Sequence, residues 1–222
     1  MILYRPKIKY VSGSALPLNN IEVAARTCYK SEDKIKSGSA EKLVDMLLSK
    51  EHTAMLEFAY LHYWIRCDRG VSHEIVRHRL FSYAQESTRY CDYEGGVGFI
   101  IPSWNIIPDG FDRDHDPDQQ EITLPEQYAE QKGCPANIWA ACMLDAETAY
   151  KHLRSKGWKP QQARSVLPNS LKTEIHVSGN LREWLHFFKL RTAKAAHPDM
   201  QLVANMILED AKGRVPLVFD KI

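Results

Sequence analysis

The residues best suited to chemistry lie in one stretch, from Arg77 to Tyr90, which reads RHRLFSYAQESTRY. It combines an Arg-His-Arg triplet (residues 77–79) and a third arginine with hydroxyl, amide and carboxylate side chains. A guanidinium group matches phosphate oxygens in a bidentate way, and hydroxyl and backbone N–H groups complete such a cradle. The stretch therefore indicates a site for a phosphorylated ligand. The alternative is an ordinary solvated basic segment whose arginines pair with carboxylates.

A helix is expected to carry the first of these cations. The side chains of residues 57–67 alternate between two faces with the period of a β-strand, and the short segment that includes Gly70 is typical of the end of a strand. Ser72 is a suitable N-cap for the next helix, which places the Arg-His-Arg triplet at the helix C-terminal end. Cations stabilise that end through the helix dipole, so part of their presence needs no ligand. The hydroxyl residues are expected on the following turn or loop.

More candidates occur in the C-terminal half. Asn180-x-x-Glu183 is typical of the start of a capped helix, and on that helix Arg182 and His186 share a face. Arg191 follows near the end of the same helix. The remaining candidates are Arg164 and His52. Such a set suits an anionic, planar ligand such as a nucleotide, and reasoning from the residues alone names no reaction.

Composition excludes several classes of protein. The chain has 222 residues, 29 basic and 28 acidic, and a net charge of +1, which argues against a general nucleic-acid or membrane-surface binder. The start of the chain lacks the pattern of a signal peptide, and no apolar stretch has membrane-spanning length. The five cysteines include no C-x-x-C pair, so we expect no disulfide framework, no structural zinc and a cytoplasmic location.

Familiar catalytic motifs are absent from the sequence. There is no dinucleotide-binding glycine pattern, no phosphate-binding P-loop, no G-x-S-x-G and no H-E-x-x-H. No metal site is predicted. Neither Ser87 nor a cysteine has a base that the sequence places beside it, so nucleophilic catalysis by these residues is unsupported.

The whole chain predicts an α+β fold, a small antiparallel sheet with packed helices, in a single domain spanning residues 1–222. Strands are expected at 2–11, 57–67 and 98–101, and residues 171–178 are interpreted as a strand or turn. Helices are expected at about 19–29, 39–50, 126–156 with a break near 133–135, 160–167, 181–192 and from 198 onward. Residues 91–124 are expected to form a long loop insertion. Its aspartates fit no EF-hand, because Pro117 and Thr123 occupy the sixth and twelfth positions.

The stretch from Arg77 to Tyr90 closely resembles the signature of flavin-dependent thymidylate synthases, in which Arg-His-Arg is followed after seven residues by Ser. Other segments resemble the family in the same order. They are AARTCY at 24–29, His52 placed 25 residues before Arg77, ARSVLP at 163–168, and the pattern N-x-R-x-x-x-x-F-x-x-L-R at 180–191. The resemblance covers most of the chain except residues 100–122.

This resemblance implies an enzyme that methylates dUMP to dTMP. The family assembles as a homotetramer with shared active sites and binds FAD between subunits. Methylenetetrahydrofolate supplies the carbon, and NADPH reduces the flavin. The family uses no cysteine nucleophile, which agrees with the absence of a Pro-Cys-His string here. Its partners are these small molecules, with no nucleic acid and no membrane.

The resemblance also assigns residues to the two main ligands. The residues implied to bind FAD are Ala54 through its backbone, Arg77, His78, Arg79, Gln85, Asn180, Leu181, Arg182 and His186. The residues implied to bind dUMP are Glu74, Ile75, Val76, Arg77, Gln85, Glu86, Ser87, Thr88, Arg89, Arg164 and Arg191. Arg191 is the implied catalytic residue, because a fixed cation against the uracil stabilises negative charge as it develops on the ring. His52 is an additional candidate.

Three positions depart from the common family pattern. Ala84 stands where many members have Asn, Gln85 where they have Glu, and His186 where Asn is common. Gln85 lacks the charge of Glu, so the contact that it would make is left open. Two other interpretations use the same arginines: a non-catalytic nucleotide- or RNA-binding module, and a structural subunit of an oligomer. Both expect a protein without bound flavin.

Overall fold

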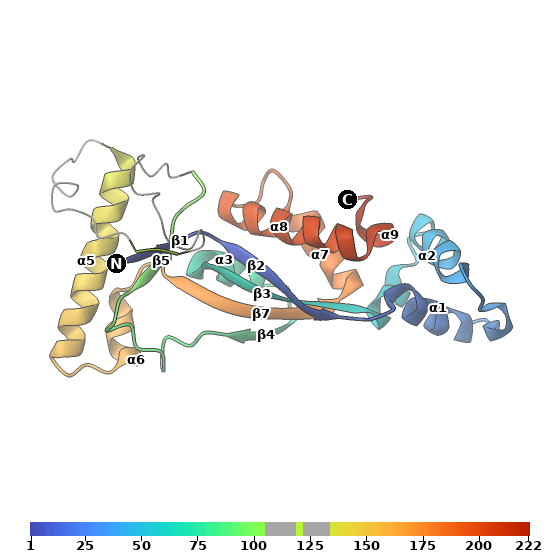
Figure 1. The fold of residues 1–222 in the computed structure, drawn as a ribbon, viewed down its shortest axis with the longest axis horizontal. Coiled ribbons are helices and arrows are strands. Elements are labelled where there is room, and N and C mark those ends of the chain that lie inside the picture. Colours follow the sequence, from blue (N-terminus) through green and yellow to red (C-terminus); the bar gives the residue numbers. More distant parts are fainter. Residues whose placement is uncertain (105–118, 122–133) are drawn as a thin grey trace. The chain divides into compact units, whose positions relative to one another are not determined.

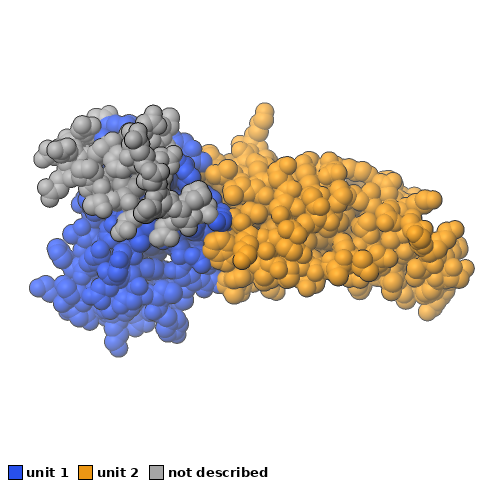
Figure 2. Space-filling view, in the orientation of Figure 1, with its two compact units in different colours: residues 1–7, 66–73, 85–175 blue, residues 8–65, 74–84, 176–222 orange. Residues whose placement is uncertain are grey.

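The structure, a computed structural model, describes residues 1–104, the backbone of 119–121, and residues 134–222. Contacts group the chain into two compact units, each assembled from separate segments (Figure 2). The first unit contains residues 1–7, 66–73 and 85–175, and the second contains residues 8–65, 74–84 and 176–222. The expected single domain spanning the whole chain stays a prediction.

Helices and strands are interspersed along the chain (Figure 1). The strands are β1 (Ile2–Tyr4), β2 (Lys7–Gly13), β3 (Tyr60–Asp68), β4 (Ser82–Gln85), β5 (Gly98–Ile100), β6 (Gln119–Glu121) and β7 (Lys172–Asn180). The α-helices are α1 (Pro17–Thr27), α2 (Ser39–Ser49), α3 (Arg69–Ile75), α5 (Pro135–Ser155), α6 (Pro160–Ala163), α7 (Leu181–Arg191), α8 (Pro198–Arg214) and α9 (Pro216–Phe219). Short 3₁₀ turns occur at Glu32–Lys34, Thr53–Phe58 and Arg164–Val166. This order confirms the predicted mixture of helices and strands, although the strands form two small sheets and not one.

In the first unit, β1 is the central strand of a three-stranded sheet with the order β5-β1-β6. It runs parallel to β5, with Leu3 opposite Phe99, and antiparallel to β6. Leu3 and Phe99 are buried with Tyr150 and Met143 of α5 in one hydrophobic cluster. The predicted strand near residues 98–101 is confirmed, whereas its parallel pairing with the N-terminal strand was not expected.

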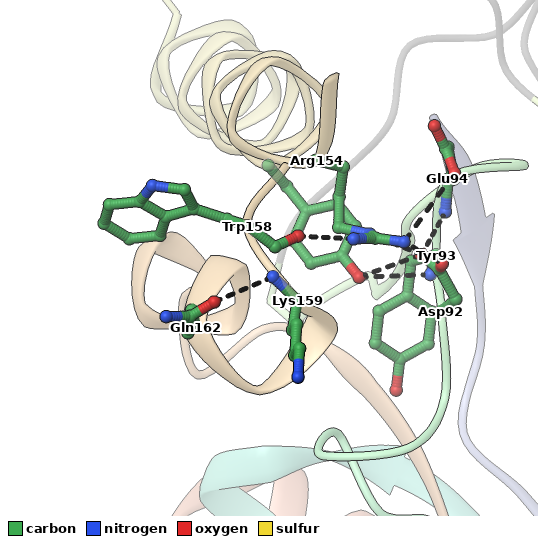
Figure 3. A network of polar contacts seen from close by, with 8 residues as sticks. Asp92, Tyr93, Glu94, Arg154, Trp158, Lys159 and Gln162 are labelled. Atoms are coloured by element: carbon green, nitrogen blue, oxygen red, sulfur yellow. Dashed lines mark hydrogen bonds and ion pairs between the residues drawn. The ribbon is translucent and has the colours of Figure 1, made fainter. Parts of the chain in front are cut away.

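An ion-paired network joins the segment after β4 to the C-terminal end of α5 (Figure 3). Two nitrogens of Arg154, Nε and Nη2, donate to the Asp92 carboxylate at 3.1 and 2.6 Å, and the same guanidinium donates to the carbonyl of Trp158. The hydrogen bond from Arg154 is the main cause that holds the pKa of Asp92 below its usual value. Arg154 is therefore a cation that already has a carboxylate partner.

A four-stranded sheet has the order β2-β3-β7-β4. Along β3, Leu61, Tyr63 and Ile65 are buried, while His62 and Trp64 between them are only partly buried. This pattern confirms the predicted alternation of the strand. Its buried face also has a polar anchor, because the Tyr63 hydroxyl donates to Asp210 of α8 at 2.7 Å.

Gly179, near the end of β7, allows a close approach between the sheet and an aromatic ring. A Cβ atom at this position would lie 1.9 Å from Cδ1 of Phe81, which no side chain tolerates. Phe81 is buried and packs at 4.5 Å, ring to ring, on Trp184 of α7. The missing side chain of Gly179 thus lets Phe81, which follows the Arg-His-Arg triplet closely, enter the core of the second unit.

Helix α7 begins as the sequence predicts. The Asn180 side chain accepts a hydrogen bond from the backbone N–H of Glu183 at 2.8 Å, which satisfies one of the free donors at the helix start. The helix then buries Trp184, Phe187 and Phe188. In the second unit α7 packs against α8, and the two helices lie side by side (Figure 1). This packing fixes the position of Arg191, the last residue of α7.

The predicted strand at the N-terminus needs revision, and some other predictions fall outside the described residues. The predicted strand at 2–11 is divided into β1 and β2 by residues 5–6, where Pro6 cannot donate to a strand ladder. The predicted helix start before residue 134 and most of the predicted loop insertion lie outside the described part of the chain. Among the described helices, none combines the length and apolar character that crossing a lipid bilayer requires.

Candidate active site

The Arg-His-Arg triplet lies in a turn that follows α3. The helix ends at Ile75, so the prediction that the triplet occupies a helix end is wrong. The hydroxyl of Tyr83 lies 2.7 Å from the carbonyl oxygen of Ile75 and 2.6 Å from that of His78, and it can donate to either. Burial is the main cause that raises the pKa of Tyr83, so this donor is kept. Tyr83 therefore fastens the turn that presents His78.

Arg191 joins two other predicted site residues in the second unit. Its Nη1 lies 2.6 Å from the Oε2 atom of Glu74, and its Nη2 donates to the Glu74 carbonyl oxygen at 3.1 Å. Its Nε donates to the Nε2 atom of His78 at 3.0 Å. The side chains of Arg191 and Glu74 are 19% and 33% exposed. The guanidinium group is thus held by three hydrogen bonds while part of it stays accessible.

His78 is the buried member of this cluster. It is 4% exposed and packs against the rings of Phe187 and His186, at 5.0 and 5.5 Å between centroids. Burial, followed by the charge of Arg191 and the neighbouring His186, lowers the pKa of His78 to about 4. His78 is therefore a neutral imidazole at neutral pH, and its Nε2 atom is the acceptor toward Arg191.

Two predicted flavin-binding residues, Ala54 and Arg182, line one cavity of the second unit together with the additional candidate His52. This cavity measures about 340 Å³ and is lined by His52, Ala54 and Arg182 together with apolar residues such as Leu47 and Met55. The two other arginines of this group, Arg77 and Arg79, are exposed, and neither forms an ion pair with a described residue. Free guanidinium groups of this kind suit a phosphate.

Other predicted residues of the second unit have structural roles. Ile75 and Leu181 are fully buried, whereas Val76 is exposed. The Asn180 side chain is engaged as the cap of α7. For Ile75, Leu181 and Asn180 the structure therefore does not favour a side-chain contact with a ligand.

In the first unit, the hydroxyl-rich part of the signature is joined by Arg164. Its Nη1 atom donates to the hydroxyl of Thr88 at 2.8 Å, although the two residues are 76 positions apart. The Ser87 hydroxyl accepts from the backbone N–H of Arg89 at 3.4 Å, and the Arg89 guanidinium lies 5.3 Å from the ring centre of Tyr90. Arg164 and Arg89 form no ion pair with a described residue. Hydroxyl groups and two uncompensated cations thus occur together.

Gln85 and Glu86 precede that cluster and have different environments. Gln85 donates through its amide nitrogen to the hydroxyls of Ser72 at 2.9 Å and Thr173 at 3.2 Å. The Ser72 hydroxyl itself donates to the carbonyl of Arg69, so toward residue 85 it can only accept. An ionised glutamate at position 85 has no N–H or O–H group to donate to the Ser72 hydroxyl. This is a physical reason for the amide side chain of Gln85. The carboxylate of Glu86 accepts from Tyr93 at 2.7 Å and pairs with Lys172 at 3.2 Å.

Comparison of the sequence with known proteins identifies the family of this chain. Residues 11–217 match the family model described as "Thymidylate synthase complementing protein". A curated relative from Geobacter sulfurreducens, named flavin-dependent thymidylate synthase, is 30% identical over 96% of this chain and 85% of its own length. One with the same name from Corynebacterium efficiens is 33% identical over 90% of this chain and 77% of its own. The chain belongs to the flavin-dependent thymidylate synthases.

A solved structure has the same fold as this flavin-dependent thymidylate synthase. It is the UMP/dUMP methylase PolB from Streptomyces cacaoi bound with 5-Br dUMP, with a TM-score of 0.77 and 23% sequence identity. The superposition covers 98% of this chain and 95% of the other. This likeness supports the mixed α/β architecture and says nothing about individual residues.

The residues of this thymidylate synthase suit the flavin that its family requires. The cavity at Ala54 has apolar lining residues that suit a flat ring, and its lining also includes Glu51 and Arg182, whose guanidinium pairs with Glu57. Arg77 and Arg79 offer exposed charges that no described carboxylate neutralises. Apolar lining residues and, elsewhere in the second unit, uncompensated guanidinium groups are the two kinds of group that a dinucleotide carrying a pyrophosphate needs.

Two residues that contact the candidate site, Tyr83 and Glu183, were missed by the sequence interpretation. Tyr83 carries no motif, and its role depends on a turn that only the folded chain forms. The sequence pattern assigned Glu183 to a capping box with Asn180. That role alone explains a glutamate at the third position of a helix, so no other role was sought. Glu183 is instead 6% exposed and lies 3.4 Å from Nδ1 of His78. An acidic residue beside the predicted Arg182 was the signal available.

Proposed function

We propose that this chain catalyses the reductive methylation of dUMP to dTMP, with methylenetetrahydrofolate as the carbon donor and NADPH as the reductant. The observation that carries the proposal is the family match over residues 11–217, together with curated relatives that share one name. FAD, when bound, supplies the hydride chemistry. The protein supplies binding, orientation and electrostatics, and these tasks can be divided among the residues described above.

Arg191 is proposed to act on the uracil ring. Its guanidinium is fixed by Glu74 and His78, so its orientation is set before substrate arrives. A preorganised cation of this kind stabilises negative charge as it develops on the ring, when carbon 5 becomes nucleophilic. Because Glu74 balances its charge, the cluster suits a ring that is neutral in the ground state. Glu74, Ile75 and Val76 would form the neighbouring wall of the dUMP site.

The first unit is proposed to hold the phosphate of dUMP. Arg164 and Arg89 are exposed cations without an ion-pair partner among the described residues, and Ser87 and Thr88 add hydroxyl groups. Charge-assisted hydrogen bonds from such groups are the strongest contacts that a phosphate monoester can receive. Gln85 and Glu86, at the start of this segment, are proposed to face the remainder of the nucleotide.

The flavin is proposed to be held by residues of the second unit. Arg77 and Arg79 would neutralise its pyrophosphate, and His78 would face it as a neutral ring. Ala54, Arg182 and His52 share the cavity that suits the flat ring system. The further residues of this proposal are Gln85, Asn180, Leu181 and His186.

The assembly and location of the enzyme are also proposals. The family resemblance supports a homotetramer in which different subunits contribute to one active site. The free cysteines in the described residues, Cys28, Cys67, Cys91, Cys134 and Cys142, agree with a reducing compartment such as the cytoplasm. Light scattering of the purified protein would test the tetramer directly.

A visible absorption spectrum of the purified protein tests the proposed function. We expect an oxidised-flavin spectrum that bleaches under anaerobic conditions with NADPH, and faster when dUMP is added, with UMP as the matched control nucleotide. Addition of methylenetetrahydrofolate should then yield dTMP, measured by chromatography. A colourless protein that takes up no FAD would favour the non-catalytic nucleotide-binding or structural-subunit alternatives instead.

A further inference from the structure

Glu183 has a buried carboxylate next to a buried nitrogen that lacks a hydrogen bond. The Nδ1 atom of His78 is a buried side-chain polar atom without a hydrogen-bond partner among the described residues. Its distance to Oε1 of Glu183 is 3.4 Å, within ion-pair range but too poorly aligned for a hydrogen bond. A buried donor left unsatisfied destabilises the folded state. An arrangement of this kind calls for a functional reason.

The tautomer of His78 follows from its other nitrogen. Nε2 accepts a hydrogen bond from Nε of Arg191, a group that always carries its protons. Nε2 therefore has no proton, and because the ring is neutral, the single ring proton is on Nδ1. The nearest acceptor for that proton is the Glu183 carboxylate. The four side chains form a chain of contacts from Glu74 through Arg191 and His78 to Glu183.

A metal ion is the competing explanation for this cluster. One ligand atom each from His78, Glu183 and His186 can lie within 4.8 Å of the others. A metal bound to Nδ1 of His78 would use the lone pair of that nitrogen, so Nδ1 could carry no proton. Because Nε2 also has no proton when it accepts from Arg191, the ring would have to be an imidazolate anion. The guanidinium of Arg191 at 3.0 Å from the same ring adds electrostatic repulsion toward a cation. The hydrogen-bonding explanation needs neither an unusual ionisation state nor an added ion.

We propose that Glu183 is a positioning residue, whose carboxylate accepts the Nδ1–H of His78 and so fixes the ring that orients Arg191. The inference rests on the proposed function, since it concerns the residue proposed to act on uracil. Hydrogen bonds at catalytic sites are often long without ligand and tighten when the reacting complex forms. In the unliganded protein the 3.4 Å contact is not yet a hydrogen bond. Its closure in the reacting complex satisfies the buried proton and tightens the contact between His78 and Arg191.

The tautomer is measured without any ligand, by ¹⁵N NMR of the histidine rings, with His78→Gln to identify the signal. We expect a proton on Nδ1 and none on Nε2 in the unliganded protein. A proton on Nε2 overturns the proposal. Titration with Zn²⁺ forms a second arm, in which stoichiometric binding that Glu183→Ala abolishes also overturns it. Neither arm depends on turnover, so a protein that makes no dTMP would refute the proposed function and leave this inference decidable.

Kinetics of two variants test positioning against a merely structural role. Glu183→Ala should lower kcat for dTMP formation by about tenfold or more while KM for dUMP changes little, since loss of a ring-orienting acceptor affects the transition state. Glu183→Gln keeps an acceptor oxygen and should restore kcat to about a third of the wild-type value or better. Unchanged kcat in Glu183→Ala, or equal impairment of both variants, overturns the proposal.

Glu147→Gln is the matched control. Glu147 is 3% exposed and is bound by the N-terminal amine at 2.8 Å and Lys151 at 2.9 Å in the first unit. It has no contact with the described site residues named above. We expect this variant to lower the unfolding midpoint and to leave kcat unchanged, which separates the general cost of losing a buried carboxylate from the specific effect at His78.

Discussion

Arg191 and Arg164 are both proposed to contact dUMP, yet their electrostatic surroundings differ. Arg191 is ion-paired with Glu74 at 2.6 Å and hydrogen-bonded to a buried neutral imidazole. Arg164 is exposed. Within the described residues, the hydroxyl of Thr88 is the one hydrogen-bond partner of its side chain. A compensated arginine offers direction with little net charge, whereas an uncompensated one offers charge that attracts an anion.

This contrast separates two tasks that the sequence shows as one set of arginines. The paired arginine suits a neutral ring that becomes negative only during reaction. The unpaired arginines suit a phosphate that is negative from the start. Ion-pair partners, rather than residue type, therefore assign the roles, and the following experiments test the assignment.

The largest effect is expected for Arg191→Ala. Removal of one preorganised donor to a developing charge costs about a hundredfold to a thousandfold in kcat. Flavin content should be retained, because the proposed flavin contacts do not include Arg191. Steady-state dTMP formation and the flavin spectrum of the same preparation provide the two measurements. Normal turnover would remove Arg191 from the mechanism and end the contrast.

A pH-dependent loss of stability is expected from His78, the neutral partner of Arg191. Its pKa in the folded protein is lowered to about 4 from an unfolded value of 6.5, so between these values the unfolded chain binds more protons. The free energy of unfolding should thus fall as pH decreases through this range, by about 2 kcal/mol between pH 7 and pH 5. Urea unfolding at both pH values checks this.

His78→Gln provides the reference for that measurement. The variant lacks the titrating ring but retains an acceptor for Arg191, so the contribution from position 78 should vanish. An equal pH dependence in wild type and variant would show that His78 is not kept neutral by the fold.

Arg164→Ala and Arg89→Ala should act mainly on binding. Loss of one charge-assisted hydrogen bond to a phosphate corresponds to about a tenfold increase in KM for dUMP, with little change in kcat. The control is Arg154→Ala in the same unit, whose guanidinium is engaged by Asp92. That variant should lose stability and keep its KM. A kcat effect in Arg164→Ala as large as that in Arg191→Ala would contradict the division of tasks.

The smallest effect is expected for Gln85→Glu, which restores the charge common in the family. The Ser72 hydroxyl would lose its donor, so we expect a loss of about 1 kcal/mol in unfolding free energy. Thermal unfolding measures it, with Gln162→Glu on the exposed surface as the control. A stabilised Gln85→Glu protein would show that the hydroxyl pair at Ser72 and Thr173 adapts to a carboxylate.

Local patterns predicted much of the fold, and long-range contacts account for what they missed. Alternation along β3 and the cap at Asn180 depend on neighbours in sequence, so both were predictable. The bond between Arg164 and Thr88 spans 76 positions, and that between Arg191 and Glu74 spans 117. No spacing rule predicts such contacts, and the family resemblance selected the residues without indicating which arginine has a carboxylate partner.

Local sequence patterns also gave wrong or incomplete predictions where one pattern was enough to explain a residue. A serine before an apolar segment predicted a helix that would carry the Arg-His-Arg triplet, but the helix ends at Ile75 and Tyr83 fastens a turn instead. Glu183 satisfied a capping pattern, so its burial beside His78 was not anticipated. In both cases the competing tertiary contact decided the outcome.

The close contact between Gly179 and Phe81 means that the residues tolerated at one of these positions depend on the residue at the other. Under selection for growth without thymidine, a library randomised at codon 179 should return glycine alone, because even alanine would clash with Phe81. A library randomised at codons 179 and 81 together should return new pairs, with a small residue at 179 and a smaller side chain at 81. Sequence change near the Arg-His-Arg triplet is thus restricted by a residue that contacts no proposed ligand and becomes possible only in coordinated steps.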